Sequence, residues 1–488
     1  MALSDGTRRP SLPVLILAGA GALALLGALL LAQAGSFRDF LPNGLTTANR
    51  TLNQTMAVVM TSIALVIPLT ANLYTPRLVR LYVTHPLIVG GLSAFFLSEL
   101  VILSLHFYPP DHPFSRLAAR VVVVLYVGIM LGALPYFYGL SQFLRPTYFL
   151  PMLTRRVIQG FEGLRRGRRV QKTGREAFET VDVMTNIALT GLARGDRQLV
   201  LQALGGLHAL LLELIGEPEG CASWRNSQAW FVPGLAREGQ TFLVRERVWP
   251  EAYLIGQALK VTEAATRRQQ EVLSEQADHL VVSAGLAAAR GQARVVELHV
   301  MAFNTLLREA VEAGDLRRFQ NLSYYMRLLI EALRGDPARM LDTTGHLIHY
   351  ARIGARLGVP HVIETVIYDL GELALSLGIL EEARSLEMIQ AWAGPLWQEG
   401  MAPGSTLGKA AWRTVLRVYW EARAAELREV ADALYWRFLR DDAVHREQLE
   451  LVLEENRELH YEFNDRLMRF AYLSPRAVVL AEAFEVAW

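Results

Sequence analysis

The segment GDLRRFQNLSYYMRLLIEALRGDP, residues 314–337, begins with a Gly-Asp pair and ends with the same pair followed by Pro337. Between the pairs, apolar residues recur at intervals of three and four, which predicts one α-helix of about 18 residues. Glycine adopts the left-handed conformation that ends a helix at little cost, and Asp315 and Asp336 are suited to cap the helix that follows. Pro337 fits a first-turn position. The segment therefore predicts a helix between two tight turns.

The same punctuation recurs along the chain. The glycines concerned are separated by 23, 21, 23 and 20 residues, and they are Gly291, Gly314, Gly335, Gly358 and Gly378. Alternate members lie 44, 44 and 43 residues apart, the length of a two-helix repeat. Pro360 again suits a first turn, and Gly195-Asp196 resembles Gly314-Asp315. The pattern predicts an all-α domain, repeat-like from about residue 278, built either as stacked helical hairpins or as a plain bundle.

Upstream of this domain the chain is strongly apolar. Each of four runs approaches or exceeds the roughly 20 residues that cross a bilayer, and they are 12–34, 55–74, 86–108 and 119–143. The first run also resembles a signal peptide, since Arg8 and Arg9 precede it and AQA at 32–34 resembles a cleavage site. We expect an uncleaved anchor. The fold class predicted is all-α, a four-helix transmembrane block followed by a large cytoplasmic helical domain.

The net charge of +1 conceals a division along the chain. Residues 1–150 hold nine Arg and four acidic residues, 151–175 hold eight basic residues and Glu162, and 176–488 have a balance of −11. With four spans and the N-terminus inside, cytoplasmic segments carry thirteen basic residues and outside segments four, as the positive-inside rule requires. Only three of the 49 basic residues are Lys, which is typical of a GC-rich bacterial genome. We therefore expect a bacterial inner-membrane protein with both termini in the cytoplasm.

Glu99 lies near the middle of the third apolar run, where a carboxylate is costly unless it faces protein or water. His85, Leu92, Glu99 and His106 are spaced by seven residues, so they fall near the same helix face. In the second run, Gln54, Thr61 and Asn72 fall near one line with Pro68. These residues are a candidate polar site in the membrane. Either they border a hydrated path for an ion or proton, or they bond neighbouring helices.

A second candidate site is basic. Pro76 breaks the helix in ANLYTPRLVRLYV, residues 71–83, and places Arg77 and Arg80 at interface depth. A basic collar follows the fourth run, with Arg155, Arg156, Arg165, Arg166, Arg168 and Arg169. Such clusters anchor topology and attract anionic lipid headgroups. The PRLxR elbow, two further spans and a helical domain together resemble a bacterial family of uncharacterised predicted membrane proteins. The resemblance covers about residues 50–215 and implies this architecture without an activity.

The chain lacks the phosphate-loop, nucleophile-elbow and HExxH motifs, so no enzyme class and no cofactor is predicted. His346, His349 and His361 form a weak candidate metal group, although histidines in such positions more often pack or cap. The single cysteine, Cys221, excludes a disulfide framework within the chain. An acidic soluble half argues against a nucleic-acid partner.

We therefore expect a transmembrane domain over 1–145, a basic collar over 146–175, a cytoplasmic all-α domain over 176–404 and a C-terminal helical segment over 405–488. Helical repeats present extended surfaces that bind proteins, so the first functional hypothesis is a membrane-anchored scaffold or sensor. It would contact anionic lipids, associate with itself and bind protein partners through the cytoplasmic domain. The alternative is an oligomeric channel or transporter with Glu99 in the path.

Overall fold

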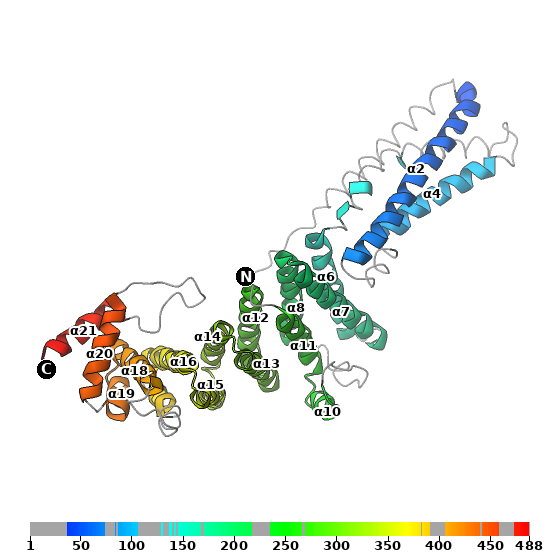
Figure 1. Ribbon diagram of the computed structural model, residues 1–488. Coiled ribbons are helices and arrows are strands. Elements are labelled where there is room, and N and C mark those ends of the chain that lie inside the picture. The colour runs from blue at the N-terminus through cyan, green and yellow to red at the C-terminus, as the bar shows by residue number, and fades with distance from the viewer. Residues whose placement is uncertain are drawn as a thin grey trace. The chain divides into compact units, whose positions relative to one another are not determined.

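The computed structural model describes residues 37–73, 83, 86–105, 128–129, 136–138, 141–142, 145–166, 170–216, 235–265, 269–381, 383–390, 406–439, 442–457 and 473–487. All regular secondary structure in these ranges is helical (Figure 1), which confirms the all-α prediction. The chain forms two compact units, Met1–Arg155 with Asp182–Gln202, and Arg156–Val181 with Ala203–Trp488.

The first unit contains α2 (Phe37–Leu73) and α4 (Pro86–Leu105), which pack against each other. The buried hydrophobic side chains of α4 recur every seven residues, at Ile88, Phe95 and Ile102, so one stripe of this helix faces protein. A Cβ added to Gly91 would lie 2.5 Å from Cε2 of Tyr136. Gly91 therefore permits a close approach of the 136–138 segment to α4.

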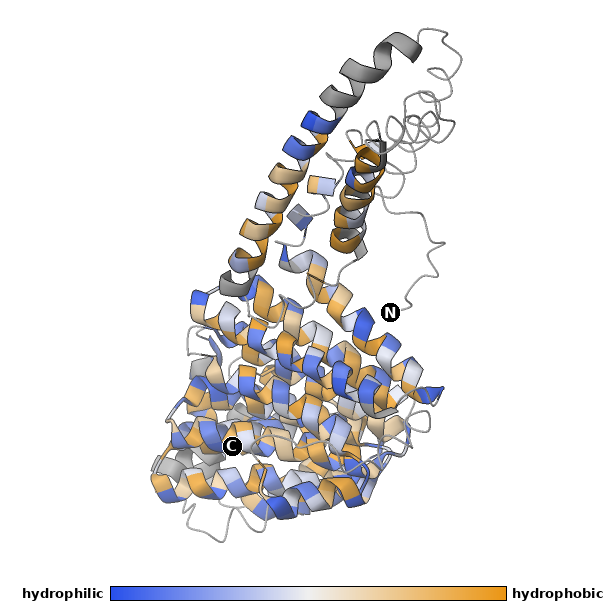
Figure 2. Ribbon diagram, turned by 90° about the vertical axis from the view of Figure 1, so that its right-hand side faces the viewer, coloured by the Kyte–Doolittle hydropathy of each residue, from blue (hydrophilic) through white to orange (hydrophobic). Residues whose placement is uncertain are grey.

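Two helices among the described residues are long and apolar enough to cross a membrane, judged by length and composition. One is Asn49–Leu69 of α2, which is 17% buried, and the other is Arg197–Gly216, or α8, which is half buried. A half-buried apolar helix is typical of a soluble core, whereas the exposed apolar surface of α2 is not. Ile88–Leu103 of α4 is a shorter apolar stretch. Figure 2 shows hydrophobic colouring along most of α4.

Helices α2 and α4 correspond to the second and third predicted spans, 55–74 and 86–108. The first predicted span, 12–34, lies outside the described residues, as does most of the fourth, 119–143. After the fourth run come α6 (Pro146–Arg165), α7 (Val170–Arg194) and α8 (Arg197–Gly216). The α7–α8 turn has the predicted chemistry, because Gly195 has φ +72° and Asp196 Oδ1 accepts the Leu199 N–H at 3.1 Å.

The helices of the second unit form an array of stacked hairpins (Figure 1). Its members are α10 (Arg237–Arg245), α11 (Trp249–Ala264), α12 (Gln270–Ala289), α13 (Ala293–Glu312), α14 (Leu316–Ala332), α15 (Pro337–Leu357) and α16 (Pro360–Leu380). The C-terminal part adds α18 (Thr406–Ala424), α19 (Arg428–Leu434), a π-helical turn (Tyr435–Leu439), α20 (Asp442–Arg457) and α21 (Pro475–Ala487).

Two kinds of contact hold the array together. Consecutive helices from α12 to α16 pack as antiparallel hairpins, and α12, α14, α16 and α18 also contact one another in series. This second series is the stacking that distinguishes a helical repeat from a plain bundle. Phe303, Phe319 and Met326 are fully buried between the layers. The Tyr350 hydroxyl joins α15 to α13 by donating to the carbonyl oxygen of Asn304 at 2.7 Å.

Most of the predicted turns are confirmed. Gly291, Gly314 and Gly358 have φ of +66°, +61° and +66°. Asp315 and Asp336 accept the N–H groups of Arg318 at 3.1 Å and Arg339 at 3.2 Å. Pro337 and Pro360 occupy first-turn positions. The regular spacing in the sequence therefore reports real helix ends.

Two glycines behave differently. Gly335 lies in the turn after α14 but has no positive φ, and the helix has already ended at Ala332. Gly378 was wrongly predicted to end a helix, because α16 continues to Leu380. A Cβ at Gly378 would lie 3.0 Å from Cδ1 of Leu427, so this glycine serves close helix packing instead of chain reversal.

Candidate functional site

Gln54 and Thr61 of the predicted membrane site lie on an exposed face of α2. The Thr61 hydroxyl donates to the Ala57 carbonyl oxygen at 2.8 Å, so its hydrogen-bonding capacity is met within the helix. Asn72 belongs to the same helix, and its side chain is outside the described part of the structure. His85 and His106 also lie outside the described residues.

Glu99 occupies the packed side of α4. Its neighbours on that side, Phe95, Ser98 and Ile102, are 6%, 1% and 5% exposed, whereas Phe96 and Leu100 on the other side are 58% and 67% exposed. Glu99 Oε1 is buried and accepts no hydrogen bond from the described residues. Gln54 and Thr61 therefore lie on an exposed face of α2, whereas Glu99 lies on the packed face of α4.

The basic collar is partly exposed and partly paired. Arg155, Arg156 and Arg166 are exposed on and just after α6. Arg165 Nη2 donates to Glu213 Oε1 at 2.7 Å, so its charge is compensated by α8. The remaining residues of the predicted basic site lie outside the described residues, and they are Arg77, Arg80, Arg168 and Arg169.

The candidate metal histidines are placed on α15 (His346 and His349) and α16 (His361). Within the described ranges, no group of three His, Cys, Asp or Glu side chains is arranged to hold a metal ion. His349 packs edge-on against Tyr350, with ring centroids 5.6 Å apart. Burial lowers the pKa of His346, and the negative charge of Asp342 acts in the opposite direction. His349 is exposed, and His346 and His361 are half-buried.

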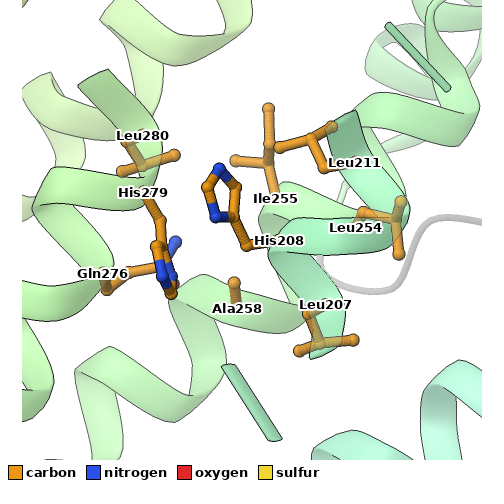
Figure 3. A pocket seen from close by; sticks show the side chains of 9 residues that line it. All are labelled: Leu207, His208, Leu211, Leu254, Ile255, Ala258, Gln276, His279 and Leu280. Atoms are coloured by element: carbon orange, nitrogen blue, oxygen red, sulfur yellow. The ribbon is translucent and has the colours of Figure 1, made fainter. Parts of the chain in front are cut away.

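A group of titratable side chains that sequence reasoning missed lies where α8 meets α12. The rings of His208 (α8) and His279 (α12) stack with centroids 4.1 Å apart and planes inclined by 24° (Figure 3). A cavity of about 10 Å³ adjoins the rings and is otherwise lined by aliphatic side chains and Gln276. That volume is close to the minimum for one water molecule, so the cavity excludes a substrate.

Burial keeps these rings neutral. It lowers the pKa of His208 to about 3, with further lowering by His279 and His299. It also lowers the pKa of His279, against the opposing effect of Glu275 and Asp278. Nε2 of His208 and Nδ1 of His279 are buried and have no hydrogen-bond partner among the described residues. Ring lone pairs lie in the ring planes, so two stacked rings do not direct them at one metal ion.

His299 on α13 completes the cluster through Ser283. Its Nδ1 lies 2.7 Å from the Val295 carbonyl oxygen and its Nε2 lies 2.8 Å from Ser283 Oγ. A carbonyl only accepts, so the neutral ring carries its proton on Nδ1 and accepts from the Ser283 hydroxyl. Both side chains are fully buried. Burial lowers the pKa of His299 to about 4. This Ser-His pair is closed to substrates and is structural.

The second polar feature is an ion-pair ladder that crosses α14, α16 and α18. Fully buried Asp369 accepts from the Ser323 hydroxyl at 2.5 Å, and its Oδ1 lies 3.7 Å from Arg327 Nε. On the next step, Arg417 Nη2 donates to Glu372 Oε1 at 2.6 Å, and its guanidinium lies 4.3 Å from the centroid of the Tyr368 ring. Each step joins two helices, so the ladder fixes their register.

Both features combine residues far apart in the chain. His208, His279 and His299 each stand alone in an apolar helix, and one local signal was available, a histidine within the apolar run LGGLHALLLELI of α8. A single histidine on an apolar face gives no indication of its partner. The ladder offered acidic and basic residues at helical spacing, which is equally typical of a solvated surface.

No protein-family model and no curated protein matches the chain. A solved structure described as a "Circular tandem repeat protein with novel repeat topology and enhanced subunit contact surfaces" aligns with 97% of this chain and 98% of its own. The two share 15% of their residues, and the TM-score is 0.36.

Proposed function

We propose that this protein is a membrane-anchored scaffold or sensor of the bacterial inner membrane, whose helical array lies on the cytoplasmic side and associates with itself and with protein partners. The observation that carries the anchoring is the exposed apolar surface of α2 and α4, where Leu65, Phe96, Leu97 and Leu100 are between 58% and 67% exposed. Apolar area of this extent on two neighbouring helices is stable in lipid and unfavourable in water.

The orientation rests on the distribution of Arg. Exposed Arg155 and Arg156 lie in α6, the helix that follows the fourth apolar run, and belong to the side that retains positive charge. The scaffold part of the proposal rests on the stacked hairpins, since repeat arrays offer long surfaces that bind other proteins.

Two measurements test the proposal. The full chain should stay with the membrane fraction after alkaline carbonate washing, and a green fluorescent protein fused to Trp488 should fluoresce while an alkaline phosphatase fused there stays inactive. Chemical crosslinking in native membranes should then give a discrete oligomer. A chain that washes off the membrane, or an active phosphatase fusion, would refute the anchoring and the orientation respectively.

A second function is favoured by one observation, the buried Oε1 of Glu99, which receives no hydrogen bond from the described residues. An acid of this kind within a membrane helix suits a proton or cation path. Proton or cation flux into liposomes that contain the purified protein, abolished by Glu99→Gln and unaffected by Glu162→Gln, would identify conduction. Absence of flux with the wild-type chain would leave the scaffold function alone.

A further inference from the structure

Helix α8 packs apolar side chains toward α11 and α12, and three further contacts among the described residues join it to the repeat array. The His208–His279 stack joins it to the middle of α12. At its C-terminal end, Gln292 Nε2 donates to the Ile215 carbonyl oxygen at 2.7 Å, and Arg290 Nη1 donates to that of Gly216 at 2.6 Å. The two end contacts are hydrogen bonds to carbonyls that α8 leaves open, and they do not depend on a histidine. The stack therefore is the titratable part of this joint.

The surroundings of the stack favour uncharged rings. The cavity beside the rings is lined by Leu207 and Leu211 of α8, Leu254, Ile255 and Ala258 of α11, and Leu280 of α12. A proton on either ring would place a charge among these aliphatic side chains, and protons on both would place two like charges about one ring-stacking distance apart. The packing of α8 against α12 therefore favours the neutral forms of His208 and His279.

The groups that face the stack on each element are few. On α12 they are Glu275, whose Oε1 lies 3.3 Å from His279 Nε2, and Asp278. On α13 the group is His299, which acts on His208 as a like charge when protonated. From α11 the cavity receives apolar side chains only, within the residues that line it. Glu275 is half exposed and gives a proton on His279 a partner once α8 has moved away.

We propose that the His208–His279 stack is an acid-sensitive joint, which holds α8 against α12 at neutral pH and releases it when the cytoplasm acidifies. Along the chain, α6, α7 and α8 lie between the apolar helices and the array, so opening of the stack loosens the hold on α8 within this connecting segment. The proposal deepens the sensor function proposed above and rests on it for its biological meaning, while opening of the joint is measurable whether or not the chain senses anything.

The direction of the response follows from proton linkage. Each ring has a lower pKa in the closed joint than in the open one, so the open state binds more protons and gains population as the pH falls below about 6.5. Between about pH 7.5 and 5.5, each histidine multiplies the opening constant by up to about 10-fold. The pair together multiplies it by up to about 100-fold.

Amide hydrogen exchange of the full chain in detergent, followed by mass spectrometry, tests this directly. After correction for the intrinsic effect of pH on exchange, peptides from α8 and α12 should open up to about 100-fold more at pH 5.5 than at pH 7.5, while peptides from α15 should not. His208→Phe and His279→Phe each keep an aromatic ring and should reduce the response to about 10-fold. The double variant should abolish it, and His349→Phe should respond like the wild type.

An acid response that persists in the double variant would overturn the proposal, as would a wild-type chain without one. If a Phe variant does not fold, deuterium exchange at the imidazole C2 position of the wild-type chain gives the answer. A pKa of His208 well below 5 supports the joint, and a value near 6.5 refutes it. Neither outcome bears on carbonate extraction or reporter orientation, so the failure of this inference and that of the membrane proposal are distinguishable.

Discussion

The turn residues show how much a single position contributes. Gly358 ends α15 with φ +66°, in the left-handed region that residues with a Cβ adopt at a cost of about 1 kcal/mol. Gly345 lies in the middle of the same helix, is exposed, and has no atom within 4 Å of an added Cβ. One residue type thus occupies two positions with opposite requirements.

Gly358→Ala should therefore lower the thermal unfolding midpoint of the full chain, since it costs about 1 kcal/mol. Gly345→Ala is the matched control and should raise the midpoint, because alanine is favoured by about 0.5–1 kcal/mol inside a helix. Circular dichroism at 222 nm measures both. Equal shifts of the same sign would contradict the assignment of Gly358 as a left-handed cap.

A buried charge gives the second prediction at this scale. Arg417 is 3% exposed and depends on Glu372, whereas the Arg476–Glu426 pair is largely exposed on both sides. Glu372→Ala leaves a buried guanidinium without its carboxylate and should destabilise the array by about 3 kcal/mol. Glu426→Ala should leave the urea midpoint unchanged. Comparable effects of the two substitutions would show that Arg417 is more hydrated than its burial indicates.

Among elements, α16 and α18 approach each other closely. A Cβ added to Gly371 would overlap Cγ2 of Val418, so the contact between these helices requires a glycine. Gly371→Ala should cost about 1–3 kcal/mol through overpacking. Adding Val418→Ala should recover part of that loss, since it removes the opposing methyl groups. Urea denaturation of the two variants measures the coupling, and additive losses would contradict the direct contact.

Features that depend on residues close together in the sequence could be predicted from it, and features that depend on distant residues could not. Asp315, Asp336 and Gly358 act on residues three or four positions away, and the sequence alone indicated each of them correctly. Gly378 looked the same in the sequence, but a distant side chain, Leu427, determines its role. The choice between stacked hairpins and a bundle was open for the same reason, because it depends on which helices meet in space. The His208–His279 stack joins residues 71 positions apart and carried no local signal of pairing.

For the whole molecule, the basic collar makes the sharpest prediction. Replacing Arg155, Arg156, Arg166 and Arg168 by Gln removes half of the eight basic residues between 151 and 175. The retention signal weakens accordingly, and a C-terminal phosphatase fusion should become active in part of the population. Lys at the same four positions keeps the charge and should keep the phosphatase inactive. An active Lys variant would mean that chemistry specific to Arg, rather than positive charge, orients the chain.

The stacking of α12, α14, α16 and α18 in series also governs how the molecule comes apart. Each of these helices is supported mainly by its immediate neighbours, with α21 and α20 closing the far end against α18. Unfolding of α20 and α21 therefore exposes α18 and leaves the packing around α12 unchanged. Under heat or pulling force, the helices should therefore unfold stepwise from the carboxyl end of the array. The thermal unfolding transition should be broader than that of a single cooperative domain.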